Sequence, residues 1–158
     1  MTNLSNLAPN GKAVTESSTF GRASAVCIDI QADASIIWAL LTNAADFSRW
    51  NSTIISIEGE IKLGETIRLK ATLDPSRTFK IKIMESIPEQ RMVWGDGMGR
   101  RKFELERLGE RQTRFTMHEK MGSMMFPLFA SKIPPFDEAF EDYAADLKRE
   151  AELIQNAK

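Results

Sequence analysis

The sequence has few of the residues that usually build metal sites and covalent cross-links. It contains one cysteine, Cys27, and one histidine, His118. A single cysteine allows no disulfide bond within the chain, and the two residues together are too few for a Cys- or His-based metal cluster. Free cysteines are commonly buried as small apolar side chains, so we expect Cys27 in the core. No metal ion and no other cofactor is expected.

The chain also lacks an excess of positive or negative charge. The chain has 21 Lys and Arg residues against 22 Asp and Glu residues, a net charge of -1. It therefore has no overall field that would attract nucleic acid or an anionic membrane. The basic cluster Arg100-Arg101-Lys102 precedes a strand-like alternation, which favours a local strand face over a nucleic-acid patch. Gly95-Asp96-Gly97-Met98-Gly99 lacks the spacing of a dinucleotide motif and predicts a flexible hairpin connection.

Long apolar runs are absent as well. No segment approaches the roughly 18 apolar residues that a membrane span requires. Residues 1–18 are polar and lack the apolar segment of a signal peptide, so a cytoplasmic location is expected. We interpret residues 1–18 as a flexible arm and residues 19–158 as a single domain. The oligomeric state stays open.

What the sequence does contain is an ordered series of periodic segments. Alternation within residues 19–31 predicts a first strand, and Asp33 then offers the side-chain oxygen of a helix N-cap. Helical spacing follows over residues 34–42, and residues 43–49 predict a second short helix or a turn. Six further alternating runs lie within residues 55–61, 67–73, 79–84, 92–94, 103–106 and 113–119. Such alternation gives each strand one apolar and one polar face, as in an antiparallel sheet.

One long amphipathic helix closes the chain. Steps of four and three residues form a single apolar stripe made of Phe136, Phe140, Tyr143, Leu147, Ala151 and Ile154. Pro134-Pro135 limits where this helix begins, and residues 124–132 predict a separate short helix or a mobile loop. The element order predicts an α+β fold: a curved seven-stranded antiparallel sheet wrapped around the long C-terminal helix, with two short helices after the first strand and a cavity between sheet and helix.

This ordered set of residues resembles the SRPBCC superfamily, also called the START or Bet v 1-like fold, and within it the polyketide cyclase/dehydrase-like branch. The resemblance covers about residues 20–155 and implies a helix-grip fold. The residues that carry it are Val26 to Ile30, Ile37 to Thr42, Trp50-Asn51, Glu58-Gly59, Leu63-Gly64-Glu65, Val93-Trp94, Phe103, Thr113-Arg114-Phe115, His118-Glu119, Gly122 and Leu147-Lys148. The superfamily includes lipid carriers, hormone receptors and cyclases, and none of its catalytic motifs is evident here.

Glu119 is the most informative polar residue. It shares strand parity with Phe115 and Met117, which predicts that it faces the cavity, whereas His118 points to the other face. The resemblance also places a recurrent Glu at this position. If Gly109-Glu110-Arg111 is a three-residue hairpin loop, the facing pairs are Leu108 and Gln112, Leu105 and Phe115, Phe103 and Met117, and Arg101 and Glu119. The last pair is either a structural ion pair at the barrel end or a polar anchor, or an acid/base, for a ligand oxygen.

These observations predict a protein that binds a small hydrophobic molecule (a lipid, a polyketide or an aromatic compound) in an internal cavity. Trp50 fits either the core or the cavity wall. Seven of the eight methionines lie between Met84 and Met125, where they either fill gaps or adapt to varied apolar ligands. The residues expected to contact the ligand are Trp50, Ile67, Leu69, Phe79, Ile81, Met92, Trp94, Arg101, Phe103, Phe115, Met117, Glu119, Met121, Phe136 and Phe140.

Two alternatives stay open at the level of sequence. One is a polyketide cyclase- or dehydratase-like enzyme that uses Glu119 as its acid/base, because burial in an apolar pocket raises the pKa of a carboxyl group. The other is a protein-binding or chaperone-associated module that uses the outer face of the sheet or the Met-rich segment. Residues 122–135 are expected to be the most mobile part of the folded region and to act as an adaptable gate to the cavity.

Overall fold

The computed structural model describes residues 4–158 and confirms the α+β helix-grip architecture. All strands belong to one antiparallel sheet with the order β1-β2-β8-β7-β6-β5-β4-β3. The strands are β1 (Val14–Ser18), β2 (Gly21–Ile30), β3 (Ile54–Glu58), β4 (Thr66–Ala71), β5 (Asp74–Ile87), β6 (Arg91–Gly95), β7 (Gly99–Gly109) and β8 (Gln112–Gly122). The helices are α1 (Ala34–Thr42), α2 (Phe47–Trp50), α3 (Phe126–Phe129) and α4 (Asp137–Asn156), with short 3-10 turns at Leu4–Asn6, Ala44–Asp46 and Ala130–Lys132.

The sheet has eight strands rather than the expected seven. The additional strand, β1, lies inside the segment interpreted as a flexible arm and pairs with β2 from Val14↔Ala25 to Ser18↔Gly21. Its sequence, VTESS, has no alternation of apolar and polar residues that would predict a strand. Tertiary contacts hold it instead, because the Thr15 hydroxyl shares a hydrogen bond with Ser24 and donates another to Asp137 of α4. The division into an arm and a ligand-binding domain stays a prediction.

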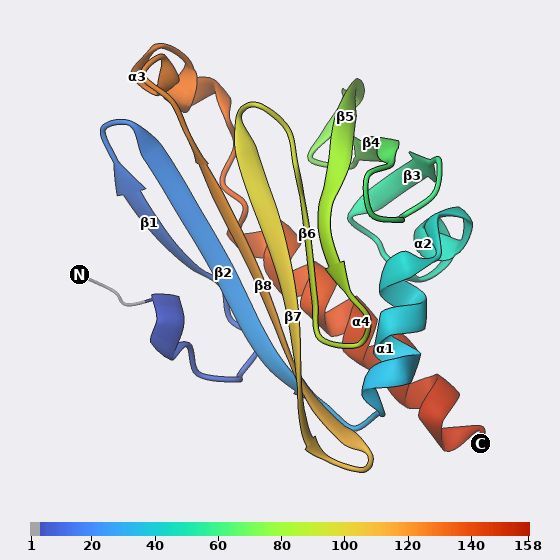
Figure 1. Cartoon of the computed structure of the whole chain (residues 1–158). Coiled ribbons are helices and arrows are strands. Elements are labelled where there is room, and N and C mark those ends of the chain that lie inside the picture. Colours follow the sequence, from blue (N-terminus) through green and yellow to red (C-terminus); the bar gives the residue numbers. More distant parts are fainter. Residues whose placement is uncertain (1–3) are drawn as a thin grey trace.

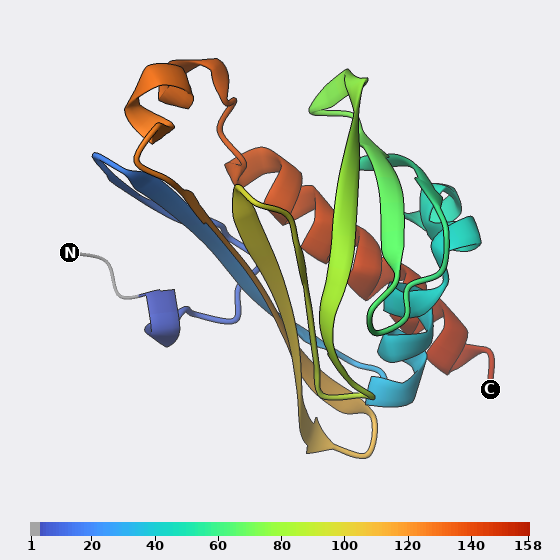
Figure 2. The same ribbon diagram turned by 45° about the horizontal axis from the view of Figure 1, so that its top comes forward.

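Helix α4 lies along the concave side of the sheet. In Figure 1 the long red helix crosses behind the strands, and the turned view in Figure 2 shows the two wings of the sheet on either side of it. Its buried side chains include Phe140, Tyr143, Leu147 and Ala151, which confirms the apolar stripe expected from the sequence. The ring of Tyr143 stacks on Phe115 with 6.3 Å between ring centroids, and this contact joins α4 to the middle of β8.

Among the hydrogen-bonded contacts that fix the position of α4 along its length, two involve its buried polar side chains Asp146 and Gln155. The Asp146 carboxylate accepts hydrogen bonds from the backbone N–H of Ser52, at 2.8 Å, and from its hydroxyl, at 2.7 Å. Near the C-terminal end, the Gln155 side chain accepts a hydrogen bond from the backbone N–H of Asp33, at 3.0 Å. No helix within residues 4–158 is long and apolar enough to cross a membrane.

The register of the last hairpin is confirmed, although its turn differs from the one expected. Arg101 faces Glu119, Phe103 faces Met117, and Leu105 faces Phe115. The loop has two residues rather than three, because Gly109 pairs directly with Gln112, and a register shift between Arg107 and Gly109 leaves Leu108 without a partner. This bulge inserts one residue and so restores the facing pairs that a regular two-residue turn would have inverted.

A second irregularity changes which isoleucines are buried at the start of β3. The sequence alternation places Ile55 and Ile57 on one face, yet Ile54 and Ile57 are buried, whereas Ile55 is 41% exposed. A register shift in the pairing with β4 between Ile54 and Ser56 explains the difference. A β-bulge adds one residue to a strand and so interrupts the alternation of buried and exposed side chains. The alternating sequence pattern alone does not reveal such a bulge.

Candidate functional site

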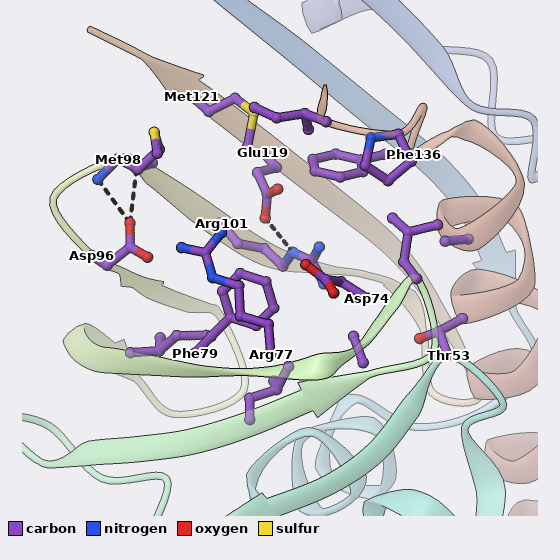
Figure 3. Close-up of a pocket in the computed structure, with 18 of the residues that line it drawn as sticks. Thr53, Asp74, Arg77, Phe79, Asp96, Met98, Arg101, Glu119, Met121 and Phe136 are labelled. Carbon is purple, nitrogen blue, oxygen red and sulfur yellow. Dashed lines mark hydrogen bonds and ion pairs between the residues drawn. The ribbon is translucent and has the colours of Figure 1, made fainter. Parts of the chain in front are cut away.

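A pocket of about 410 Å³ lies between the concave face of the sheet and the first turns of α4. Strands β4 to β8 supply one wall, α4 supplies the opposite wall, and residues of the segment from Phe129 to Pro134 close one side. Figure 3 shows the side chains of this pocket converging from the sheet and from the α4 side. The volume lies within the roughly 300–1,000 Å³ typical of sites for small molecules.

The inner wall is apolar and aromatic. Trp94 of β6 lines the pocket and packs edge-on against Phe103, with 4.8 Å between ring centroids. Phe136 and Phe140 stack at 5.9 Å at the α4 side. Leu69, Phe79 and Ile81 come from the neighbouring strands β4 and β5, so the wall is continuous across the sheet.

Most of the residues expected to contact a ligand do line this pocket. The ten that do are Leu69, Phe79, Ile81, Trp94, Arg101, Met117, Glu119, Met121, Phe136 and Phe140. Five others lie in the packed core, with side chains at most 3% exposed, namely Trp50, Ile67, Met92, Phe103 and Phe115. For the residues that lie on strands, the alternation of the sequence predicted the correct face of the sheet. It could not predict where along each strand α4 covers the sheet. A ligand-binding role for the first group stays a proposal.

Sequence reasoning missed the polar rim and one buried phenol. Asp74 and Arg77 line the pocket from the start of β5, and Asp96 lines it from the β6–β7 connection. No sequence pattern predicted a role for Arg77, and Asp96 was predicted only as part of a hairpin connection, because turns carry no periodic signal that fixes side-chain direction. Tyr143 was assigned to the apolar stripe of α4, which is correct for its ring. Its side chain, however, also lines the pocket, and its buried hydroxyl group has no hydrogen-bond partner among the described residues.

Arg101 and Glu119 form an ion pair inside the pocket. Nε of Arg101 donates to Oε1 of Glu119 at 2.8 Å, and the two side chains are 17% and 16% exposed. The guanidinium group also lies 5.0 Å from the centre of the Phe140 ring, a cation–π contact. Figure 3 shows the contact between Arg101 and Glu119 as a dashed line, with the labelled side chain of Phe136 nearby in the same pocket. The pair therefore provides a fixed polar group against an otherwise apolar wall.

The β6–β7 hairpin forms part of the pocket rim through a tight turn. Oδ1 of Asp96 accepts hydrogen bonds from the backbone N–H groups of Met98, at 2.8 Å, and Gly99, at 3.1 Å. A Cβ atom at Gly95 would lie 2.5 Å from the carbonyl oxygen of Gly99, so this close approach requires glycine. The expected hairpin is confirmed, and it holds Met98 at the pocket in a defined position.

The segment before α4 is attached to β2 by Arg22. Its Nη1 and Nη2 atoms donate to the carbonyl oxygens of Ile133, at 3.2 Å, and Pro134, at 2.8 Å. The same guanidinium lies 4.5 Å from the centre of the Phe136 ring. By contrast, Met124 and Leu128 are 89% and 71% exposed, and neither lines the pocket. The lining side chains of this segment are thus Phe129, the last residue of α3, and residues that follow it, and not the Met124–Met125 pair.

His118 and Cys27 lie outside the pocket. Cys27 is buried, as expected, and burial raises the pKa of its thiol. Burial likewise lowers the pKa of His118, and Lys102 acts in the same direction. Within residues 4–158, no group of three or more His, Cys, Asp and Glu side chains is arranged to hold a metal ion. The polar chemistry of the pocket therefore comes from carboxylates, cations and the Tyr143 phenol.

The fold and the pocket define a helix-grip protein of the SRPBCC superfamily. The model of the family described as "Activator of Hsp90 ATPase homolog 1-like protein" matches residues 31–152, and the chain belongs to this family. Comparison with curated proteins finds no match. The superfamily expected from the sequence is confirmed, and its fold generally binds hydrophobic ligands.

Solved structures resemble the chain in fold at low sequence identity. A START superfamily protein from Mycobacterium smegmatis is 14% identical, with a TM-score of 0.62 and coverage of 84% of this chain and 98% of that chain. A conserved protein of unknown function from Enterococcus faecalis is 16% identical, with a TM-score of 0.64 and coverage of 89% and 77%. A norcoclaurine synthase point mutant from Thalictrum, in complex with a transition-state analogue, is 12% identical, with a TM-score of 0.64 and coverage of 88% and 99%.

Proposed function

We propose that this protein binds a small hydrophobic molecule in the pocket between the sheet and α4. The observation that carries the proposal is a pocket of about 410 Å³ whose inner wall is built from Trp94, Phe79, Phe140 and neighbouring aliphatic side chains. Burial of an apolar ligand against such a wall is favourable by roughly 25 cal/mol per Å² of apolar surface removed from water. A cytoplasmic location stays part of this proposal.

Titration with N-phenylnaphthylamine, a neutral fluorescent apolar probe, tests the proposal. One probe should bind per chain and should quench Trp94, because this indole lines the pocket. Trp94→Phe should therefore remove most of the quenching, whereas Trp38→Phe, which alters an indole outside the pocket lining, should remove little of it. Absence of saturable binding to the folded protein would contradict the proposal.

An enzyme of the cyclase or dehydratase type is the second candidate. It is favoured by the position of Glu119, a carboxylate that lines an apolar pocket beside Arg101. In this case Glu119 would transfer a proton to or from a polyketide-like or aromatic substrate. The enzyme should turn over such a substrate, and Glu119→Gln should abolish this turnover while apolar probe binding persists. This result would favour an enzyme over a carrier.

A protein-binding module is the third candidate. It is favoured by the family description, which names an activator of the Hsp90 ATPase, and by the exposed side chains of Met124, Met125 and Leu128. This function predicts that wild type and a variant with a filled pocket both retain a protein partner in a pull-down. It also predicts that Met124→Ser/Leu128→Ser loses this partner.

A further inference from the structure

We infer that the ligand is a neutral apolar molecule carrying a carbonyl oxygen, and that the Tyr143 hydroxyl donates a hydrogen bond to this oxygen. The inference rests on the proposed function and specifies its ligand class. It comes from a phenol that the fold places in the pocket wall without giving it a partner.

Tyr143 is 1% exposed, and its side chain lines the pocket. Its ring packs against Phe115 at 6.3 Å and against Phe103 at 6.1 Å, so the position of the ring is fixed by the core. Among the described residues no polar group forms a hydrogen bond with its Oη atom. A buried hydroxyl without a partner costs free energy, so such groups in native proteins call for an explanation.

The phenol is available as a donor. Burial raises the pKa of Tyr143 above its usual range, so the hydroxyl keeps its proton across the physiological pH range. The nearby charge of Arg101 opposes this effect but does not outweigh it. A ligand oxygen with free lone pairs is therefore the complementary group, since the hydroxyl needs an acceptor more than a donor.

The charges around the pocket favour a carbonyl over a carboxylate. Three lining cations (Arg77, Arg101 and Lys132) are matched by three lining anions (Asp74, Asp96 and Glu119). A ligand carboxylate would add a negative charge that this balanced set leaves unpaired, which is costly in a partly dry site. Among residues 4–158 the one hydrogen bond of Arg101 uses Nε, so its terminal N–H groups can orient the same carbonyl from the side of β7.

Two probes of matched shape test the inference: acetylnaphthalene, which has a ketone, and isopropenylnaphthalene, in which a methylene group replaces the ketone oxygen. Wild type should bind the ketone more tightly by roughly fivefold, the size of a net neutral hydrogen bond. Tyr143→Phe removes only the hydroxyl, so it should abolish this preference and leave the affinity for the alkene unchanged. Thr116→Val, a hydroxyl deletion outside the pocket, should keep the preference.

An infrared measurement gives an independent readout. The carbonyl band of the bound ketone should shift to lower wavenumber in wild type, because hydrogen bonding weakens the C=O bond, and it should shift less in Tyr143→Phe. Equal binding of both probes by wild type, unaltered in Tyr143→Phe, would overturn the inference while leaving apolar binding intact. Failure of both probes to bind would overturn the proposed function and the inference together.

Discussion

At the scale of single residues, the pocket combines an apolar wall with a small number of polar atoms held by the fold. Arg101 and Glu119 are fixed to each other across β7 and β8, whereas Tyr143 is fixed only through its ring. The pair satisfies its own charges, so it resists rearrangement. The phenol has no hydrogen-bond partner among residues 4–158, and it is the group that we assign to a ligand oxygen.

The ion pair predicts non-additive effects on stability. Glu119→Gln should lower the free energy of unfolding by about 2–3 kcal/mol, because it leaves Arg101 with a weaker partner in a largely buried site. The double variant Arg101→Met/Glu119→Gln should recover much of this loss. Chemical denaturation of the wild type, both single variants and the double variant measures the coupling. Strictly additive single effects would show that the two side chains contribute independently.

His118 predicts a pH dependence that can be followed at one residue. Burial lowers its pKa in the native state, so the unfolded chain takes up a proton first as the pH falls below about 6.5. Stability should therefore fall as the pH decreases from about 6.5 to the native pKa, and this contribution should be absent at higher pH. Because the chain has a single histidine, the imidazole Hε1 resonance in proton NMR belongs to His118, and its shift with pH reports the native pKa.

The neighbouring Lys102 offers a matched test of the cause. Lys102→Gln should raise the pKa of His118 towards its usual value, because the lysine charge disfavours a second positive charge nearby. Lys158→Gln, at the C-terminal residue of the chain, should leave the pKa unchanged. A native His118 pKa at or above the usual value would contradict the assigned burial effect.

At the scale of elements, the connection from β8 to α4 borders the pocket, and we predict that it controls access. Residues 126–132 form only α3 and a 3-10 turn, and Phe129, Lys132, Ile133 and Pro134 line the pocket. The hydrogen bonds from Arg22 to two carbonyl oxygens hold this connection against β2. The expected mobility of residues 122–135 stays a prediction, and Arg22 gives it a specific mechanism.

Hydrogen exchange tests this element. Amides of residues 122–135 should exchange faster than those of β7 and β8, because local opening there breaks few backbone hydrogen bonds. Arg22→Gln should further increase exchange in residues 129–134, whereas Arg111→Gln, in the distant β7–β8 turn, should not. Exchange in residues 122–135 as slow as in the central strands would place the entry route elsewhere.

At the scale of the whole molecule, ligand binding and folding are linked through α4. This helix forms one pocket wall and also carries the core residues Leu147 and Ala151, so a ligand that binds only the folded chain stabilises the entire domain. At a free ligand concentration of 100 times Kd the gain is roughly 2.7 kcal/mol. For a chain of this length, such a gain raises Tm by roughly 5–10 °C.

Thermal unfolding with and without N-phenylnaphthylamine measures this shift. Ala139→Trp places a large side chain on α4 at the pocket wall, so it should abolish the shift in Tm. Comparison with the unliganded Tm of the same variant separates loss of binding from loss of stability. An undiminished shift in Ala139→Trp would show that the probe binds outside the pocket.

The sequence by itself determined the order of the elements from β2 onward, the faces of most strands and the pairing of Arg101 with Glu119. These features depend on periodicity and local turn geometry, which act over a few residues. They were sufficient for the fold class and for most of the apolar wall. Even the unexpected bulge at Leu108 preserved the register, because the apolar faces of both strands must meet the same core.

Only the tertiary structure decided which apolar residues line the pocket and which fill the core. Phe103 and Phe115 face the same side of the sheet as Met117, but the ring of Tyr143 covers them and leaves Met117 at the pocket. The strand β1 and the polar rim at Asp74 and Asp96 were likewise set by long-range contacts and turns. The position at which α4 crosses the sheet depends on the packing of the whole domain. It therefore cannot be predicted from any local pattern in the sequence.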